Sequence, residues 1–270
     1  MYNGSASTKV PQLVRLYRNA DRAVDRALGL ARVIHEGVWL GLLNPAERVA
    51  VTLTYFSQSE MYRSREHNTT VVYEWERRVF ERYFRPGCSV LVAAAGAGRE
   101  MLALRRMGCQ VHGFDCCAEL VEASRGLLSE EGMDSQVTLS APNEVPTNLA
   151  HCEAIIIGWC GYHHIPGRAR RIGFLKQLRR LVDGGAPMLL SFFTRSDSGR
   201  YEKLVWRVAR ATRFLGGFRA EPVELGDRLM VSTSAHCFEK EEVELELAAG
   251  GFRLAYYSDK EYGHAVGIAV

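Results

Sequence analysis

The sequence predicts an α/β fold, in which a mostly parallel sheet ends in an antiparallel hairpin and a set of helices precedes the first strand. From residue 88 onward, short apolar runs alternate with helical patterns, which is typical of a parallel sheet covered by helices. The last two runs, 252–258 and 265–270, are joined by only residues 259–264. That connection is too short for a crossover helix, so these two strands must pair antiparallel. About 85 residues with helical periodicity come before the first strand.

The N-terminal helices are predicted from apolar spacing and from turn residues. Leu13–Ile34 carries an apolar stripe at spacings of three and four. Asn44-Pro45 opens a second helix with proline at its first position, and two aromatic-rich helices follow at 53–65 and 71–84. We expect residues 1–85 to form a helical lid over the ligand-binding edge of a domain that spans residues 86–270.

The segment Cys88–Asp115 predicts the centre of the fold. It consists of a strand, a glycine turn, a helix and a second strand: Ser89–Ala94, Gly96-Ala97-Gly98, Arg99–Met107 and Gln110–Phe114. Gly96 and Gly98 permit a sharp bend and a close approach of a ligand to the backbone. Asp115 stands at the carboxyl end of the second strand, where open α/β sheets bind ligands. The unit therefore predicts a cradle for a nucleoside cofactor, with Asp115 accepting hydrogen bonds from the ribose hydroxyls.

Each part of this cradle has an alternative interpretation. The glycines would also serve close packing of the helix on the strand. Asp115 would also serve as the N-cap of the next helix, which begins near Ala118.

The rest of the chain continues the alternation. Helices are predicted at 118–131, 168–181, 200–215 and 238–250, and strands at 136–140, 153–158, 188–193, 252–258 and 265–270. Asp183-Gly184-Gly185 forms the turn into the strand at 188–193. No strand is predicted between residues 215 and 238.

Composition and charge limit the expected location and partners of the protein. The 270 residues have a net charge of +3, no apolar run of membrane-spanning length and no apolar signal core near the N-terminus. The seven cysteines form no C-x-x-C pair, so we expect reduced thiols, no metal and a cytoplasmic location. Residues 168–219 have a net charge of about +10 and residues 221–270 of about −6. The basic segment would suit an anionic acceptor or RNA, but solvated helix faces explain it more simply, and nucleic acid is not the expected partner.

Four segments resemble the class I S-adenosylmethionine-dependent methyltransferases. VLVAAAGAGRE is similar to the first motif of that family, HGFD to its second-strand acid, EAIIIGWCGYHHI to its fourth strand and substrate-facing loop, and LRRLVDGGAPMLLSFF to its helix, Gly-Gly turn and fifth strand. The segment HCFEKEEVELELAAGGFRLAYYS is similar to the last helix and strand of that family. The resemblance covers about residues 86–270. It implies a Rossmann-like methyltransferase sheet, S-adenosyl-L-methionine as cofactor and S-adenosyl-L-homocysteine as product.

The resemblance also implies a cofactor site. The implied residues are Ala95, Gly96 and Gly98 under the cofactor, Asp115 at the ribose with Cys116 next to it, Asn143 near the adenine amine, Gly158 at the end of the fourth strand, Trp159 stacking on substrate or cofactor, and Tyr62. An ordinary loop position for Asn143 and plain core packing for Trp159 are the alternatives. Tyr55 and Tyr62 are seven residues apart in one predicted helix, so they would share a face. They would close over the sulfonium or bind the methionine carboxylate, although packing within the helical core is the simpler interpretation.

Two positions depart from the family pattern. Val92 or Ala93 stands where the family has an acid, and Ala94 or Ala95 stands where it has the first glycine. Alanine costs little there if its φ is negative. Loss of the acid removes a polar contact to the methionyl end, unless another group supplies it.

His163 and His164 follow the fourth predicted strand and are the candidate catalytic residues. An imidazole there would take the proton from an acceptor hydroxyl. In the alternative, one histidine packs or caps and the other is solvated.

The predicted function is methyl transfer to oxygen or nitrogen of a small molecule, in a protein that does not enter a membrane. A homodimer is left open as its assembly. Two alternatives stay open. One is a cofactor-binding partner or sensor without catalysis, and the other is methylation of RNA or protein.

Overall fold

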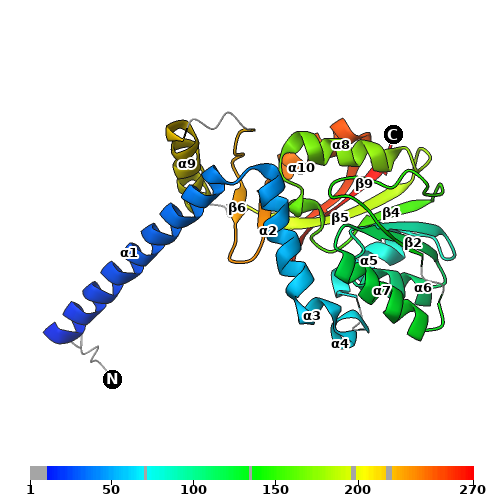
Figure 1. The fold of residues 1–270 in the computed structure, drawn as a ribbon, viewed down its shortest axis with the longest axis horizontal. Coiled ribbons are helices and arrows are strands. Elements are labelled where there is room, and N and C mark those ends of the chain that lie inside the picture. The colour runs from blue at the N-terminus through cyan, green and yellow to red at the C-terminus, as the bar shows by residue number, and fades with distance from the viewer. Residues whose placement is uncertain (1–10, 70–71, 134–135, 196–198, 217–220) are drawn as a thin grey trace, which may run out of the picture.

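The structure, a computed structural model, describes residues 11–69, 72–133, 136–195, 199–216 and 221–270 (Figure 1). The helices are α1 (Gln12–Leu42), α2 (Pro45–Gln58), α3 (Glu60–Arg63), α4 (Arg65–Thr69), α5 (Glu74–Tyr83), α6 (Arg99–Arg106), α7 (Ala118–Glu130), α8 (Arg168–Arg179), α9 (Arg200–Leu215) and α10 (Lys240–Gly250), with one short 3-10 turn, η1 (Tyr162–His164). The strands are β1 (Ser89–Ala93), β2 (Gln110–Asp115), β3 (Val137–Leu139), β4 (Ala154–Ile157), β5 (Pro187–Thr194), β6 (Asp227–Leu229), β7 (Ser234–Phe238), β8 (Phe252–Ser258) and β9 (Gly263–Ala269).

The main sheet runs in the order β3-β2-β1-β4-β5-β9-β8. The first five of these strands pair in parallel, whereas β9 is antiparallel to both β5 and β8. The predicted α/β class and its antiparallel C-terminal hairpin are therefore confirmed. The strand order reverses between β1 and β4, and such a switch point is where open α/β sheets bind ligands.

The sheet is buried on both faces because its central strands are apolar throughout. Val90 and Val92 of β1 face the core under α5, α6 and α7, while Leu91 and Ala93 face the core under α8 and α10. Each of these side chains is at most 2% exposed. Burying an aliphatic side chain of this size contributes about 1.5–3 kcal/mol, so β1 is a central source of stability for the edge that carries the glycine turn.

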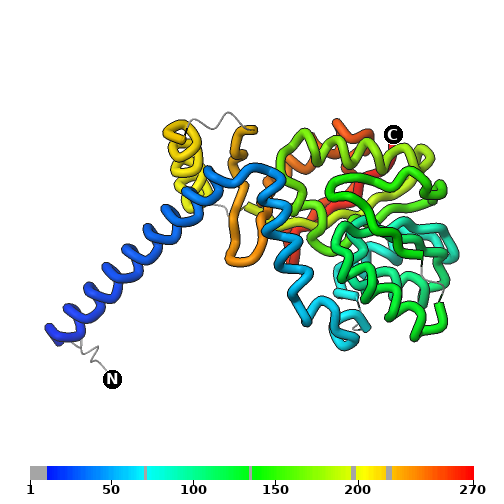
Figure 2. The backbone as a smooth tube through the Cα atoms, in the orientation of Figure 1, coloured from blue at the N-terminus to red at the C-terminus, as the bar shows by residue number. Residues whose placement is uncertain are grey.

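Helix α1 does not lie over the ligand-binding edge of the sheet. It projects from the body, and only its C-terminal part packs against α9 (Figures 1 and 2). Two glycines allow this close crossing: a Cβ on Gly37 would lie 2.6 Å from Cβ of Val208, and one on Gly41 would lie 2.6 Å from the carbonyl of Ala209. The helices that reach the edge are α2, α3 and α4.

The single helix predicted over 53–65 is wrong. The chain breaks at Ser59, whose backbone is extended, so Tyr55 lies in α2 and Tyr62 in α3. α2 begins as predicted, with Pro45 at its first position and a capping box between Asn44 and Glu47. The helix predicted over 71–84 begins at Glu74, and residue 71 lies outside the described residues.

Strands β6 and β7 were not predicted. They form an antiparallel pair, and β7 also pairs in parallel with the end of β5, where Phe193 lies opposite Cys237. Their sequences contain Asp, Arg, Ser and His, so they show no apolar alternation. A salt bridge of 2.8 Å between buried Arg48 of α2 and Asp227 of β6 connects this pair to the N-terminal helices.

Candidate functional site

The turn after β1 has the backbone that a ligand cradle requires. Gly96 has a φ of 54°, and a Cβ at Gly96 would meet no atom within 4 Å, so this position opens toward free space. Gly98, with a φ of 95°, instead packs under α7, because its Cβ would lie 2.6 Å from Oγ of Ser124. Ala94 also has a positive φ, 54°. The condition under which alanine costs little is therefore not met, and the chain holds a strained residue at this turn.

Asp115 at the end of β2 is bound to the same turn. Its Oδ2 accepts a hydrogen bond of 2.8 Å from the Gly96 N–H, and its Oδ1 accepts one of 2.8 Å from the Cys117 N–H. Burial raises the pKa of this carboxyl, and these backbone hydrogen bonds act in the opposite direction. Asp115 does not cap α7, whose N-cap residue is Cys117 and has no side-chain cap. A carboxylate offers about four acceptor positions, so at least one remains for a ligand.

A cavity opens beside this turn. Its first part lies between the turn and helices α2 to α4 and encloses about 790 Å³ when the open solvent at its mouth is included. Its second part extends toward the loop that follows β3 and encloses about 560 Å³ counted in the same way. Both parts are lined by Ala94, Asp115, Cys116, Gly161, His164, Thr52 and Leu53. The carboxyl ends of β1, β2 and β4 thus share one cavity at the switch point of the sheet.

The structure brings most of the predicted cofactor residues to this cavity. The first part is also lined by Ala95, Gly96, Trp159 and Tyr62, and the second part by Asn143. Gly98 and Gly158 do not line it. Gly158 allows β4 to approach β1, because a Cβ there would lie 2.2 Å from the Ala94 carbonyl oxygen.

A buried ion cluster that the sequence did not reveal also borders the cavity. Arg99 of α6 donates two hydrogen bonds to Glu76 of α5, at 2.7 and 2.8 Å, and one to Glu100 at 2.8 Å. Glu100 Oε1 also accepts a hydrogen bond from the Trp159 N–H at 2.9 Å. All three charged side chains are at most 7% exposed, and Arg99 and Glu100 line the cavity. Two acids and one arginine give the cluster a net charge of −1 when all are ionised.

The pair Arg99-Glu100 directly after the glycine turn is the sequence signal from which part of this cluster could have been predicted. The first turn of a helix that starts at a ligand edge is close to the ligand. Glu76, however, is 23 residues before Arg99, and nothing local in the sequence connects them.

The two candidate catalytic histidines form one hydrogen-bonded chain. The Phe193 N–H donates to His163 Nδ1 at 3.3 Å, so the neutral ring carries its proton on Nε2. That nitrogen lies 3.2 Å from His164 Nε2, and His164 Nδ1 lies 2.8 Å from the Ser234 carbonyl oxygen, to which it donates. In this arrangement every ring nitrogen already has a partner.

The two histidines differ in position. His164 lines both parts of the cavity, whereas His163 is 1% exposed and lies behind it. Burial lowers the pKa of His163 well below its usual value. Burial also lowers the pKa of His164 to about 4, although the hydrogen bond to Ser234 acts in the opposite direction. The geometry thus favours His164 over His163 as the residue that faces a substrate, and a catalytic role for either stays a prediction.

Aromatic rings form the wall opposite the turn. Phe56 lies 5.1 Å from Tyr62 and 5.5 Å from His164 between ring centroids, and Tyr62 lies 5.3 Å from His67. Tyr55 and Tyr62 meet at 6.1 Å although they belong to different helices. Burial raises the pKa of Tyr62 to about 12, so its hydroxyl stays neutral and able to donate.

Comparison with solved structures identifies the fold. The chain superposes on 1,6-didemethyltoxoflavin-N1-methyltransferase from Burkholderia thailandensis with a TM-score of 0.59 and 16% identity, covering 84% of this chain and 91% of that one. A SAM-dependent methyltransferase from Methanosarcina mazei gives a TM-score of 0.58 and 15% identity, covering 74% and 99%. The chain has the class I S-adenosylmethionine-dependent methyltransferase fold. The [4+2]-cyclase SpnF matches the same fold with a TM-score of 0.51 and 16% identity, covering 68% and 59%. No family model matches the sequence, and no curated protein does.

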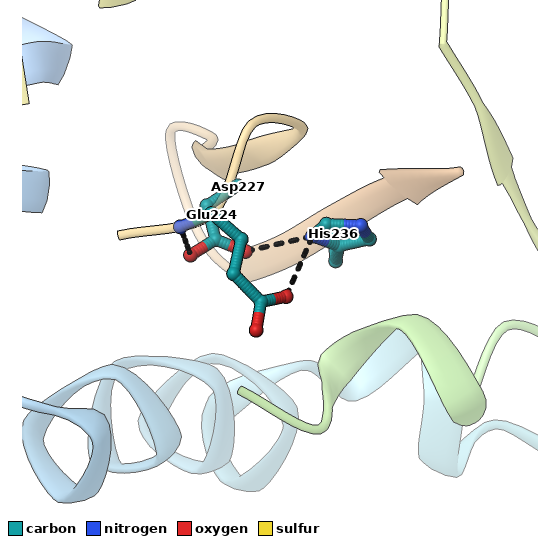
Figure 3. A group of neighbouring side chains, drawn as sticks. All are labelled: Glu224, Asp227 and His236. Atoms are coloured by element: carbon teal, nitrogen blue, oxygen red, sulfur yellow. Dashed lines mark hydrogen bonds and ion pairs between the residues drawn. The ribbon is translucent and has the colours of Figure 1, made fainter. Parts of the chain in front are cut away.

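A second buried cluster lies outside the cavity of this methyltransferase fold. Figure 3 shows the carboxylates of Glu224 and Asp227 directed at one edge of the His236 ring. His236 Nδ1 lies 2.8 Å from Asp227 and 3.7 Å from Glu224. Arg48 and Arg171 already bind these two acids at 2.8 Å. The arginines supply the positive charge that a metal ion would bring, so the cluster is an ion network that joins α2 and α8 to the β6–β7 pair.

The uneven charge of the sequence is partly balanced in space. Arg170 pairs with Glu221, Arg171 with Glu246 and Arg195 with Glu242. Each pair joins the basic segment 168–219 to the acidic segment 221–270, so these arginines are not free to bind an anion.

The structure also shows the state of the cysteines. Those at 88, 109, 116, 117, 152, 160 and 237 are free thiols. Among the described helices none has the length and apolar character that a membrane crossing requires.

Proposed function

We propose that the chain is an S-adenosylmethionine-dependent methyltransferase that methylates oxygen or nitrogen of a small molecule in the cytoplasm. The observation that carries this proposal is Asp115. Its carboxylate lies at the carboxyl end of β2, lines both parts of the cavity and is fixed beside the open Gly96 position. An acceptor group at this edge suits the two hydroxyls of a ribose.

The residues around the cavity fit this cofactor. Asp115 would hold the ribose, Asn143 in the second part would meet the adenine, and the backbone at Ala95 and Gly96 would lie beneath the cofactor. S-adenosylmethionine supplies a methyl group that its positive sulfonium already activates. The protein's own contribution is then to position the acceptor, exclude water and remove a proton.

Glu100 is proposed to replace the acid that is missing at the end of β1. Its Oε1 accepts from Arg99 and Trp159, whereas its Oε2 has no hydrogen-bond partner among the described residues. The cluster that it forms with Arg99 and Glu76 carries a net charge of −1 when all three are ionised, which suits the α-ammonium group of the methionyl end. Tyr62 and Phe56 across the cavity would contact the sulfonium by cation–π attraction.

We propose His164 as the proton acceptor for a hydroxyl substrate, with His163 as its positioning residue. A proton on His164 Nε2 requires that His163 turn its own Nε2–H away. The low pKa of His164 makes it a weak base at neutral pH, so this role demands a rearrangement when the acceptor binds. Helices α2 to α4, the part of residues 1–85 that lines the cavity, are proposed as the mobile cover.

Calorimetry with S-adenosylmethionine and S-adenosylhomocysteine tests the cofactor proposal, and a screen of acceptors for release of S-adenosylhomocysteine tests turnover. Glu100→Gln is expected to weaken cofactor binding by about tenfold or more, the effect of about 1.4 kcal/mol or more. Glu122→Gln, an exposed acid on α7, is the matched control and should bind normally. Equal affinities for both variants would remove Glu100 from the site, and no binding by the wild type would refute the proposed function.

A second candidate function is cofactor binding without methylation. The strained Ala94 and the absent strand-one acid favour it, and the [4+2]-cyclase SpnF shares the fold. Cofactor binding with no turnover across a broad screen would support this candidate. Methylation of RNA or protein is less well supported, because the pairs that Arg170, Arg171 and Arg195 form leave the basic segment partly neutralised.

A further inference from the structure

The N-terminal part of α1 exposes a long apolar stripe. Its first buried residue is Val33. Before that point, Leu13 is 78% exposed, Tyr17 67%, and both Val24 and Leu28 are 56% exposed. Figure 2 shows this part of the helix extending away from the body, with no other described segment beside it. An apolar face of this length is atypical of a surface that only meets water.

The spacing of the stripe is that of a coiled coil. Six of its residues alternate at intervals of four and three, so that they form one straight line along the helix: Leu13, Tyr17, Ala20, Val24, Ala27 and Ala31. We call these six residues the α1 seam. Large residues occupy mainly its N-terminal half and alanines mainly its C-terminal half, so the seam does not match itself when two copies run in parallel and in register.

We propose that the α1 seam binds the α1 seam of a second copy of this chain, with the two helices antiparallel. In this orientation Leu13 lies opposite Ala31 of the second copy and Tyr17 lies opposite Ala27. Val24 lies opposite Ala20. Each large side chain then meets a small one, which lets the two helices approach closely and fills the space between them. A twofold axis near residue 22 repeats every contact, as an isologous dimer requires.

The length of the paired segment also fits this orientation. The body of each copy begins at Val33, beyond the paired segment, so the two bodies lie at opposite ends of the pair.

A membrane surface is the other partner that an amphipathic, arginine-rich helix would suit. The seam does not favour it. Asp21 and Asp25 would face anionic headgroups, which opposes the attraction of the arginines on the same helix. The membrane is therefore an outcome of the test and not the proposal.

Sedimentation equilibrium on the full chain tests the dimer. Val24→Glu places a charge in the centre of the seam at a position that is exposed in the single copy. It is expected to raise the dimer dissociation constant by about 100-fold or more, because each dimer buries two such charges. Arg22→Glu changes charge on the opposite side of the helix and should leave the dimer intact. A monomeric wild type, or a Val24→Glu variant that dimerises as well as the wild type, would overturn the proposal.

Disulfide trapping tests the orientation. A mixture of Leu13→Cys and Ala31→Cys chains should give a covalent heterodimer under mild oxidation, while Leu13→Cys alone should give none. A Leu13→Cys homodimer would show parallel helices and would contradict the proposed pairing. Flotation with vesicles of phosphatidylcholine and phosphatidylserine completes the test. Binding by a monomeric wild type that Val24→Glu abolishes would assign the seam to a membrane surface instead.

Discussion

Asp115 has one structural role, as acceptor of two backbone N–H groups, and one proposed role, as acceptor of the ribose hydroxyls. Replacement of Asp115 should separate these two roles. Asp115→Ala removes the acceptor of the Gly96 and Cys117 N–H groups as well as the proposed ribose acceptor. A hydrogen bond to a charged group is worth about 1.5–3 kcal/mol. We therefore expect loss of the ribose contact to weaken cofactor binding by about 10- to 150-fold. Because the two backbone groups lose their partner, the ligand-free protein should also lose about 1–3 kcal/mol of stability.

The stability loss departs from what the sequence predicts, since an acid that only binds ribose leaves the ligand-free protein unaffected. Asp115→Asn is the sharper variant, because its amide oxygen keeps one of the two backbone hydrogen bonds. It should unfold at a higher temperature than Asp115→Ala and yet bind the cofactor no better. Asp183→Asn, at an acid whose side chain is 94% exposed, is the control. Thermal unfolding with and without cofactor and calorimetry measure both effects. Lower stability combined with wild-type affinity in both Asp115 variants would refute the ribose assignment.

Four further predictions follow from the same geometry. Gly96→Val should bind the cofactor at least about tenfold more weakly, since its side chain enters the cavity, and should lose stability because a β-branched residue is strained at a φ of 54°. A folded variant with unchanged affinity in calorimetry would exclude that turn. His164→Gln should lower turnover by about 10²–10⁴-fold while cofactor affinity stays within a few-fold of the wild type. His163→Gln should lower turnover less. A pH–rate profile that both variants share with the wild type would contradict the proposal that His164 is the base. Proteolysis within residues 55–65 should slow when cofactor binds, and identical cleavage would argue against a cover. Burial would raise the pKa of Asp227, but the hydrogen bond with His236 and the charge of Arg48 outweigh it and lower that pKa to about 2 from 3.8. The stabilisation by ionised Asp227 is therefore present above pH 3.8 and lost as pH falls toward 2. In Asp227→Asn the midpoint of denaturant unfolding should change less with pH over that range.

The strands of the central sheet were predictable because burial on both faces leaves a local mark. Ser89–Ala94 was predicted and β1 is Ser89–Ala93, and the strand predicted over 153–158 is β4, Ala154–Ile157. An apolar run in a parallel sheet needs no partner to be recognised. The same holds for the glycine turn, because the steric freedom of Gly96 belongs to the residue itself.

Elements held by distant partners were not predictable. β6 depends on the salt bridge between Asp227 and Arg48, which are 179 residues apart. The apolar stripe of α1 showed which side of the helix is apolar but not what covers it. In the structure the covered positions are Val33, Gly37 and Leu40, which face α9, while the more regular stripe before them stays exposed.

In the site too, features set by neighbouring residues were predictable and features set by distant residues were not. The sequence revealed the loss of an acid at Val92 or Ala93, because the residues of a motif are read one by one. It did not reveal the proposed replacement, because Glu100 becomes a cavity residue only once α6 folds back from the turn and Glu76 of α5 fixes Arg99 beside it. An acid at the end of a strand and an acid in the first turn of the following helix are separated by the glycine turn in sequence, yet they border the same cavity. The proposed function of the site therefore depends on where its negative charge lies in space, and the loss of an acid from the motif does not by itself exclude a negative charge at the site.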